Sequence, residues 1–231
     1  MKIAINGFGR IGRLFFRQAF EAGLSASGGE LEIVAINDLG DMENLAYLLR
    51  HDSVYRDFNA DVTSKNGHLI VDGKKITCIQ EKDPTKLPWG TMGIDLVIES
   101  TGFFESFEKA SVHLKAGAKR VVISAPAKDA EGTLGGKTIL MGINDGNLSS
   151  CNVSSNGSCT TNAISPVVAV LEEKIGILKA GMSTVHAYTG TQSIIDYPAK
   201  GKDYRRGRAA AQNIVPSSTG AAIAVTRAFE Q

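Results

Sequence analysis

The chain has 231 residues, of which 43% are hydrophobic and 21% are charged. This composition is typical of a globular protein and excludes a collagen-like, coiled-coil or wholly disordered chain. The formal net charge of +1 argues against a broad basic field for nucleic acid and against a membrane-surface role, so neither partner is expected. At about 150 residues per domain, the length predicts one domain and roughly half of another.

Short apolar runs alternate with stretches of helical period through the first half of the chain, which is typical of a parallel sheet with crossover helices. In chain order, the first expected elements are a strand at 3–5, a helix at 10–22, a strand at 31–36 and a helix at 42–50. Asp72-Gly73 is a two-residue hairpin signal, so residues 69–71 and 75–79 are expected to form an antiparallel ribbon. Three later apolar runs predict strands buried on both faces, at 95–99, 120–124 and 138–141.

The second half of the chain has a different texture after Cys151, where small polar residues precede an apolar helical run at 163–175. Pro166 lies inside this run, and a proline beyond the first turn should kink the helix. A strand is expected at 181–186, and Pro216-Ser217-Ser218 is expected to open a last apolar helix.

The cysteine count and the N-terminus indicate a reducing, cytoplasmic location. The three cysteines, an odd number too small for a disulfide scaffold, are Cys78, Cys151 and Cys159. The N-terminus has no long apolar region, and no stretch reaches 18 apolar residues. No metal is expected, because no metal-ligand spacing joins the cysteines to His51, His68 or His113.

A GxGxxG hexapeptide at 7–12 directly follows the first expected strand and opens the first expected helix. Gly7 would allow the tight turn, Gly9 would let backbone approach a pyrophosphate, and Gly12 would let the helix pack closely on the strand. The second strand ends at Asp38, 26 residues after Gly12, with the polar insert at 25–30 between them. A carboxylate there can accept hydrogen bonds from ribose hydroxyls and would repel a 2′-phosphate, which predicts NAD rather than NADP. A purely structural glycine turn with an aspartate cap is the alternative.

Cys159 and His186 are the candidate reactive residues. Cys159 lies just before the apolar helical run, so its sulfur would be near the positive end of a helix, which favours the thiolate. His186 ends the expected strand 27 residues later, so only tertiary folding could bring it to the cysteine. A Cys–His pair is the minimal unit for thiolate chemistry. A buried inert thiol and a satisfied core imidazole are the alternatives.

Five cations gather in an otherwise neutral chain, at Lys200, Lys202, Arg205, Arg206 and Arg208. Such a run is either a solvated face or a phosphate site, because guanidinium groups suit bidentate phosphate recognition. Thr219-Gly220, at the start of the last expected helix, could offer a hydroxyl and a backbone N–H to another phosphate.

Seven motifs in chain order resemble the phosphorylating glyceraldehyde-3-phosphate dehydrogenases. They are NGFGRIGR at 6–13, ND at 37–38, STG at 100–102, ISAPAK at 123–128, SNGSCTTN at 155–162, HAYT at 186–189 and PSSTGAA at 216–222. The motif around Cys159 is highly specific, whereas the glycine fingerprint is not. The resemblance implies a Rossmann-type doubly wound parallel sheet over residues 1–157 that binds NAD, followed by an incomplete α+β catalytic domain over 158–231.

The resemblance also implies a cytosolic glycolytic enzyme, normally a homotetramer. Cys159 would attack the aldehyde of glyceraldehyde 3-phosphate, His186 would take the thiol proton, and inorganic phosphate would release 1,3-bisphosphoglycerate. The positions that match the family's NAD contacts are Gly7, Gly9, Arg10, Ile11, Gly12, Asp38, Lys82 (commonly arginine in the family) and Ser124.

Further positions match the family's two phosphate pockets. Those that match the inorganic-phosphate pocket are Ser158, Thr160, Thr219 and Gly220. Thr189 matches the substrate-phosphate pocket. One of Arg205 and Arg206 resembles an anion contact of some bacterial members, and we assign Arg206 to the substrate site.

The sequence departs from the family pattern at its end. In the family, the TGAA helix is followed by the strands of the catalytic sheet, an arginine for the substrate phosphate, an asparagine for the nicotinamide and a final helix, so a C-terminal truncation is expected. Two alternatives stay open: an erythrose-4-phosphate dehydrogenase, which shares the glycine fingerprint and the cysteine, and an NAD-binding module without turnover, which the truncation suggests. The HAYT motif, with Thr189 placed for a triose phosphate, favours glyceraldehyde 3-phosphate over erythrose 4-phosphate as the substrate.

Overall fold

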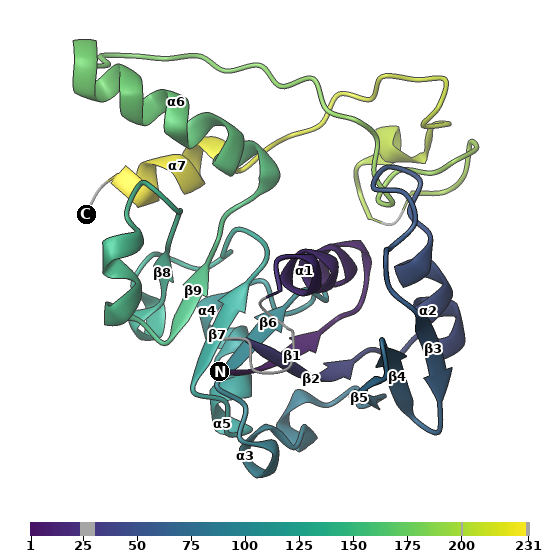
Figure 1. The fold of residues 1–231 in the computed structure, drawn as a ribbon. Helices are drawn as coiled ribbons and strands as arrows, with labels where there is room; N and C mark the ends of the chain where they lie inside the picture. The colour runs from purple at the N-terminus through teal and green to yellow at the C-terminus, as the bar shows by residue number, and fades with distance from the viewer. Residues whose placement is uncertain (24–30, 200, 230–231) are drawn as a thin grey trace.

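The computed structural model describes residues 1–23, 31–199 and 201–229 (Figure 1). Its strands are β1 (Lys2–Asn6), β2 (Glu32–Asn37), β3 (Val62–Lys65), β4 (His68–Val71), β5 (Lys74–Ile79), β6 (Leu96–Glu99), β7 (Arg120–Ile123), β8 (Lys137–Thr138) and β9 (Val153–Ser155). Its α-helices are α1 (Arg10–Glu21), α2 (Met42–Arg50), α3 (Trp89–Met92), α4 (Phe107–Ala110), α5 (Val112–Lys115), α6 (Cys159–Ile175) and α7 (Ala221–Phe229). Short 3-10 helices are η1 (Pro84–Lys86), η2 (Thr133–Gly135), η3 (Asp145–Ser150) and η4 (Tyr204–Gly207). The insert at 25–30 and Lys200 lie outside the described residues.

The strands form one sheet in the order β3-β4-β5-β2-β1-β6-β7-β9-β8. The strands from β5 to β8 along this order are parallel, and the two antiparallel pairs are β3–β4 and β4–β5. The chain places β2 on one side of β1 and β6 on the other, so the strand order reverses at β1. The expected doubly wound sheet is confirmed, and its crevice for a ligand lies where β1 and β6 end.

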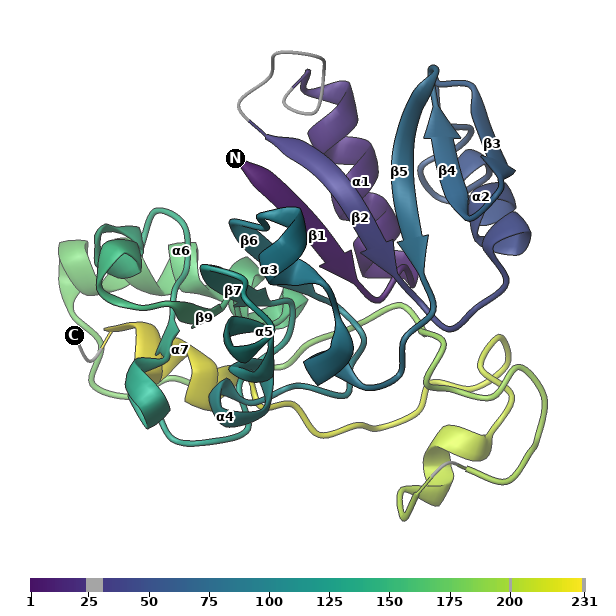
Figure 2. The ribbon, with the colours of Figure 1, turned by 90° about the horizontal axis from the view of Figure 1, so that it is seen from below.

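The two faces of the sheet are covered by different helices. Alternate residues of β1 point to opposite faces. Ile3 and Ile5 pack with Phe16 of α1 in one core cluster. Ala4 packs with Trp89 and Phe107 in the other. Figure 2 shows α3, α4 and α5 in front of the sheet and α1 and α2 behind it.

The expected hairpin is present, and a second one precedes it. Asp72 and Gly73 both adopt left-handed backbone, with φ of 47° and 78°, and join β4 to β5. Asn66 and Gly67 do the same between β3 and β4, with φ of 51° and 73°. The sequence analysis missed β3 because its residues are mostly polar, although Asn-Gly is a strong hairpin signal.

The prediction of a strand at 181–186 is wrong. The structure has irregular backbone there, and every side chain from 181 to 190 is exposed. A strand is stable only beside another strand, and the sheet of the described residues ends at β8. The strand expected at 138–141 is also shorter, because the chain turns where Ile143 N–H and Asn144 N–H donate to Leu140 O.

Both later helices begin at residues other than those expected. α6 begins at Cys159 instead of residue 163, because Ser158 is its N-cap and accepts a hydrogen bond from Thr161 N–H. The helix also runs through Pro166 to Ile175. α7 begins at Ala221, after the Pro216-Ser217-Ser218 segment. None of the helices in the described ranges is long and apolar enough to cross a membrane.

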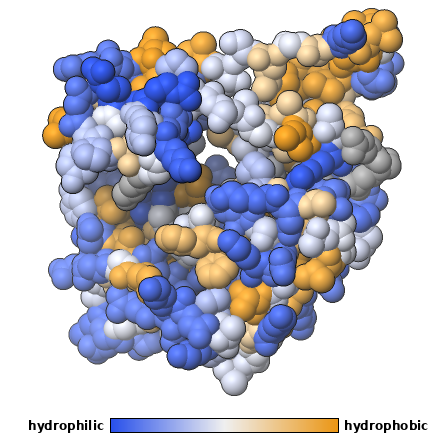
Figure 3. Space-filling model, turned by 180° about the vertical axis from the view of Figure 1, so that it is seen from behind, coloured by the Kyte–Doolittle hydropathy of each residue, from blue (hydrophilic) through white to orange (hydrophobic). Residues whose placement is uncertain are grey.

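The chain between α6 and α7 is largely exposed. It leaves the far end of α6, crosses to the side of the molecule where α2 lies, and returns to α7 (Figures 1 and 2). Its exposed apolar side chains continue those of α6, where Val170 and Ile175 are 58% and 78% exposed. Figure 3 shows hydrophobic residues gathered at the upper right of the molecule, over the region of α6.

Candidate active site

The glycine turn lies at the carboxyl end of β1. Gly7 has a φ of 92°, and a Cβ there would lie 2.6 Å from Thr101 N. A Cβ on Gly12 would lie 2.2 Å from Gly7 O, so the helix start packs directly on the turn. By contrast, a Cβ on Gly9 would meet no atom within 4 Å. The first two glycines are therefore required by packing, and Gly9 leaves open space in front of α1.

This open space fits the pyrophosphate of a dinucleotide. Gly9 is the N-cap of α1 and makes no side-chain cap hydrogen bond. The first backbone N–H groups of a helix have no intrahelical acceptor, and the helix dipole is positive at that end. An anion in front of Gly9 would therefore be held by N–H groups, as the sequence predicts.

Asp38 lies at the end of β2, beside this turn. Its Oδ2 accepts a hydrogen bond from Phe8 N–H at 2.6 Å, and its Oδ1 accepts one from Gly40 N–H at 2.7 Å. Asp38 is half-buried, so part of the residue is open to solvent at this end of the sheet. Asp38 thus both braces the glycine turn and offers a negative charge to the crevice.

We expect Asp38 to determine the choice between NAD and NADP. We expect NADP to bind at least tenfold more weakly than NAD, because the 2′-phosphate would face the Asp38 carboxylate. Asp38→Asn keeps an acceptor oxygen for Phe8 N–H and removes the negative charge. The ratio of the NADP dissociation constant to the NAD dissociation constant should therefore fall. Titrations of both nucleotides measure this ratio, and an unchanged ratio in the variant would contradict the assignment.

The other residues expected to contact the cofactor surround this end of the sheet. Arg10 makes a two-pronged ion pair with Asp52, at 2.8 and 3.1 Å, which fixes its guanidinium beside the helix start. Against desolvation, which raises it, hydrogen bonds from two backbone N–H groups and this pair with Arg10 lower the Asp52 pKa to about 2. Ile11 and Lys82 are exposed. Ser124 follows β7, and its N–H donates to Glu99 O.

A buried polar cluster beneath the crevice was missed by the sequence analysis. It comprises Asn6, Asn37, Trp89, Glu99 and His113, each at most 6% exposed. Polar residues closing three apolar strands were a signal for it. Recognising the signal requires the strand register, because only neighbouring strands bring these side chains together.

Cys159 and His186 meet as a pair. Cys159 is the first residue of the 17-residue helix α6, so its sulfur lies at the positive end of the helix. Its Sγ lies 3.3 Å from His186 Nε2. His186 Nδ1 lies 2.6 Å from Ala187 O, so Nδ1 carries a proton and Nε2 faces the thiol.

The two groups shift each other's pKa. The hydrogen bond from His186 lowers the Cys159 pKa, assisted by hydrogen bonds from Thr160 and by the charge of His186, against partial burial. The hydrogen bond to Cys159 raises the His186 pKa, assisted by the bond to Ala187 O. Both shifts favour a thiolate–imidazolium pair. Burial acts oppositely on the other two cysteines and raises the pKa of Cys78 to about 11.

The residues expected to bind phosphate form separate groups. Arg206 donates to Thr191 Oγ1 at 2.8 Å and to Ser217 Oγ at 2.7 Å. Thr189 Oγ1 lies 3.0 Å from Thr191 Oγ1, so Thr189 and Arg206 are joined through one hydroxyl. The structure records no hydrogen bond from this group to Cys159 or His186 among the described residues.

The positions expected for inorganic phosphate lie at two helix starts. Ser158 and Thr160 flank Cys159 at the start of α6, where Ser158 Oγ caps the helix. Thr219 Oγ1 accepts from Ala221 N–H at the start of α7, beside Gly220. α6 and α7 pack against each other, so all four residues lie at the starts of two helices that are in contact (Figure 1).

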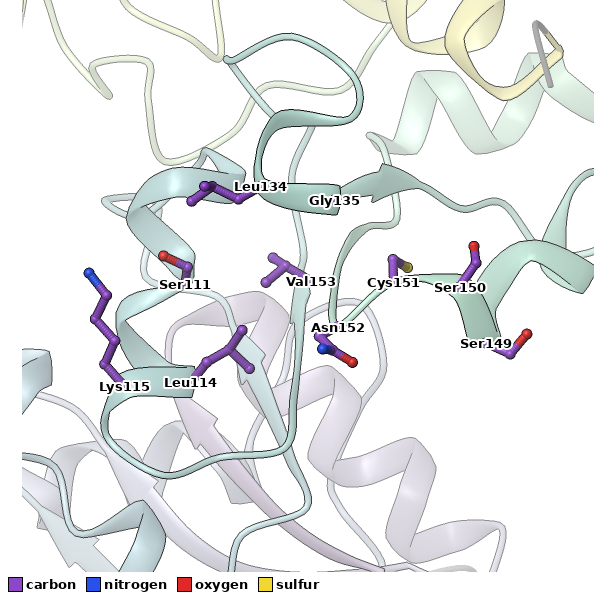
Figure 4. Close-up of a pocket in the computed structure, with 10 residues that line it drawn as sticks. All are labelled: Ser111, Leu114, Lys115, Leu134, Gly135, Ser149, Ser150, Cys151, Asn152 and Val153. Carbon is purple, nitrogen blue, oxygen red and sulfur yellow. The ribbon is translucent and has the colours of Figure 1, made fainter.

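A cavity of about 530 Å³ lies elsewhere (Figure 4). Leu114 and Lys115 of α5 line one side, and Cys151 to Val153 line the other. Cys151 and Asn152 precede β9 and Val153 begins it, whereas Cys159 follows it, so the cavity lies toward the amino-terminal end of this strand. It contains none of the predicted site residues. In the described ranges, no three His, Cys, Asp or Glu side chains are grouped to hold a metal ion.

Comparison with known proteins supplies the family. Residues 1–107 match the family model of the glyceraldehyde 3-phosphate dehydrogenase NAD binding domain, and residues 158–231 match that of the C-terminal domain. Glyceraldehyde-3-phosphate dehydrogenase 1 of Bacillus subtilis is 49% identical over 228 residues, which cover 98% of this chain and 64% of the relative. The Thermotoga maritima enzyme of that name is 50% identical over 225 residues (97% and 64%), and the Aspergillus niger one is 48% identical over 226 (97% and 63%).

The matches to these relatives run along nearly the whole chain. They include both the glycine turn and the Cys159–His186 pair. The chain spans about 64% of the length of the curated relatives it matches. The family model over the glycine turn is that of an NAD-binding domain, so the cofactor of this part of the chain is NAD. Together, the doubly wound sheet, the glycine turn and the matches show that the chain belongs to the glyceraldehyde-3-phosphate dehydrogenase family.

Proposed function

We propose that the chain carries out the NAD-dependent oxidative phosphorylation of glyceraldehyde 3-phosphate to 1,3-bisphosphoglycerate. The observation that carries this proposal is the Cys159 Sγ to His186 Nε2 contact of 3.3 Å, in a chain that also carries the NAD turn. A thiolate at a helix start is a strong nucleophile toward an aldehyde carbon.

The chemistry of the pair follows from its hydrogen bonds. The Cys159 thiolate forms a C–S bond to the aldehyde carbon, and the imidazolium of His186 stabilises the resulting oxyanion and donates its Nε2 proton to it, giving a thiohemiacetal. NAD, when bound, supplies the acceptor for the hydride of this carbon. His186 takes back the hydroxyl proton as the thioester on Cys159 forms. Inorganic phosphate then attacks the thioester carbonyl, the C–S bond breaks, and Cys159 leaves as a thiolate.

Two anions have to be bound for this reaction. We assign the substrate phosphate to Thr189 and Arg206, which Thr191 joins by hydrogen bonds. We assign inorganic phosphate to Ser158, Thr160, Thr219 and Gly220, which lie at the starts of α6 and α7. Both helix starts offer N–H groups to an anion.

The proposal also covers the organisation of the protein. Residues 1–157 would form the NAD-binding domain, because β9, the last strand of the sheet in chain order, ends at Ser155. Residues 158–231 would belong to the catalytic domain. We propose a cytoplasmic homotetramer. The apolar side chains exposed along α6 and the chain after it, such as Ile175 and Leu178, support contacts with further protein.

The proposal predicts NADH formation in two phases. With NAD and glyceraldehyde 3-phosphate but without phosphate, the 231-residue chain should give a burst of NADH absorbance of one equivalent or less. Adding phosphate should convert the burst into continuous turnover, because phosphate releases Cys159 from the thioester. The control is erythrose 4-phosphate, for which kcat/KM should be lower. NAD binding with neither burst nor turnover would contradict the proposal and favour a binding module.

A further inference from the structure

Three neighbouring strands end in polar side chains that are hydrogen-bonded to one another. Asn37 of β2, Asn6 of β1 and Glu99 of β6 lie side by side in register. Asn37 Nδ2 donates to Asn6 Oδ1 at 2.7 Å, and Asn6 Nδ2 donates to Glu99 Oε2 at 2.6 Å. This row lies at the point where the strand order reverses, directly beneath the crevice that receives the dinucleotide.

Two helices close the row from one face of the sheet. Trp89 Nε1–H donates to His113 Nδ1 at 3.1 Å, and an indole can only donate. His113 Nδ1 is therefore an acceptor, so the ring proton is on Nε2. His113 Nε2 lies 2.9 Å from Glu99 Oε2 and donates to it. His113 is thus a neutral donor that is fixed by the tryptophan.

The two oxygens of Glu99 lie within hydrogen-bond distance of four donor groups. Besides Asn6 and His113, Thr101 N–H donates to Glu99 Oε1 at 2.8 Å and Thr101 Oγ1 donates at 2.5 Å. Glu99 is 2% exposed. A buried carboxylate is retained only where hydrogen bonds replace its hydration, and here those bonds fix the turn after β6.

That turn is the surface on which the glycine turn rests. Ser100 Oγ donates to Gly7 O at 2.7 Å, and Gly7 N–H donates to Asn37 O at 2.8 Å. Thr101 N lies so close to Gly7 that no side chain fits between them. A displacement of the Glu99–Thr101 turn therefore moves Gly7, and with it the start of α1.

We propose that Glu99 is a positioning residue for NAD, acting through Thr101 and Gly7 to aim the first N–H groups of α1 at the pyrophosphate. Asn6 and His113 hold its carboxylate, and it touches no part of the cofactor itself. The inference rests on NAD binding at the glycine turn, which is part of the proposed function.

The test uses Glu99→Gln, which keeps the shape of the side chain. An amide has one acceptor oxygen in place of two, so at least one of the four donors loses its partner. We expect the dissociation constants for NAD and for ADP-ribose, which keeps the pyrophosphate, to rise at least tenfold. Hydrogen exchange should become faster in the peptides that contain Gly7 and Thr101.

Matched variants separate positioning from general destabilisation. Ile76→Val removes one methylene from the hairpin side of the core, so it should lower the Tm while leaving the NAD dissociation constant unchanged. Thr101→Ser keeps both donors to Glu99 and should bind NAD as the wild type does. Thr101→Val loses the hydroxyl and should bind more weakly, which decides the matter even if Glu99→Gln does not fold.

Three results would overturn the inference. They are wild-type NAD affinity in Glu99→Gln, an equal loss of affinity in Ile76→Val, and equal affinities in Thr101→Ser and Thr101→Val. If the wild-type chain itself bound no NAD, the proposed function would fail first, and the wild-type titration shows this independently of any variant.

Discussion

Cys159 should react with iodoacetamide at lower pH than the other two cysteines. Because Cys159 is the proposed nucleophile, Cys159→Ser should lower the turnover number by at least about a thousandfold. The hydrogen bond from His186 and those from Thr160 stabilise the thiolate, so the Cys159 pKa lies below the ordinary value of about 8.5. Cys78 and Cys151 are shifted in the opposite direction by burial. As pH rises, the Cys159 thiolate therefore forms first.

His186→Asn tests the cause of this reactivity. Without the imidazolium, the Cys159 pKa should rise, so the alkylation rate at Cys159 should reach its plateau at higher pH. Mass spectrometry of the three cysteine peptides over a pH series measures each rate separately. Cys151→Ser is the matched control and should leave the Cys159 profile unchanged. Identical Cys159 profiles in the wild type and His186→Asn would show that the observed pair does not activate the thiol.

Gly12→Ala should weaken NAD binding and also destabilise the fold, whereas Gly9→Ala should weaken NAD binding alone. A Cβ on Gly12 would lie 2.2 Å from Gly7 O, which is backbone and can yield only if the turn moves. Overpacking of this kind costs about 1–3 kcal/mol, or a fall in Tm of roughly 2–4 °C per kcal/mol for a chain of this size.

Gly9→Ala separates the effect on NAD binding from the effect on stability. Its φ of −66° suits alanine, and its Cβ would meet no protein atom within 4 Å. The methyl group would instead occupy the space in front of α1 where the pyrophosphate is expected. Calorimetry should therefore show an unchanged Tm and an NAD dissociation constant raised at least tenfold. Wild-type affinity in Gly9→Ala would contradict the placement of the pyrophosphate there.

The first half of the fold was predictable because its signals are local. Buried parallel strands are apolar runs, and Asp72-Gly73 marks a hairpin, so β1, β2 and β5 were expected within one or two residues. The glycine turn was predictable for the same reason, since Gly7 and Gly12 are required by contacts within one strand–helix unit. Short strands such as β9 carry too few residues to show a period.

Features that depend on distant parts of the chain were not predictable. The strand expected at 181–186 had the right composition, but a strand needs a neighbour that composition does not reveal. The contact of Cys159 with His186 depends on the chain returning from the far end of α6, which no spacing encodes. The Glu99 cluster requires the register of β1, β2 and β6.

The most direct measurement is the identity of the residue that carries the acyl group. The chain is incubated with NAD and glyceraldehyde 3-phosphate without phosphate, quenched in acid and digested for mass spectrometry. We predict one phosphoglyceroyl thioester, and it should lie on the peptide that contains Cys159. This thioester should be absent when NAD is left out, and its yield should be greatly reduced in His186→Asn. A thioester on Cys78 or Cys151, or none on a chain that binds NAD, would contradict the assignment of Cys159 and His186 as the reacting pair.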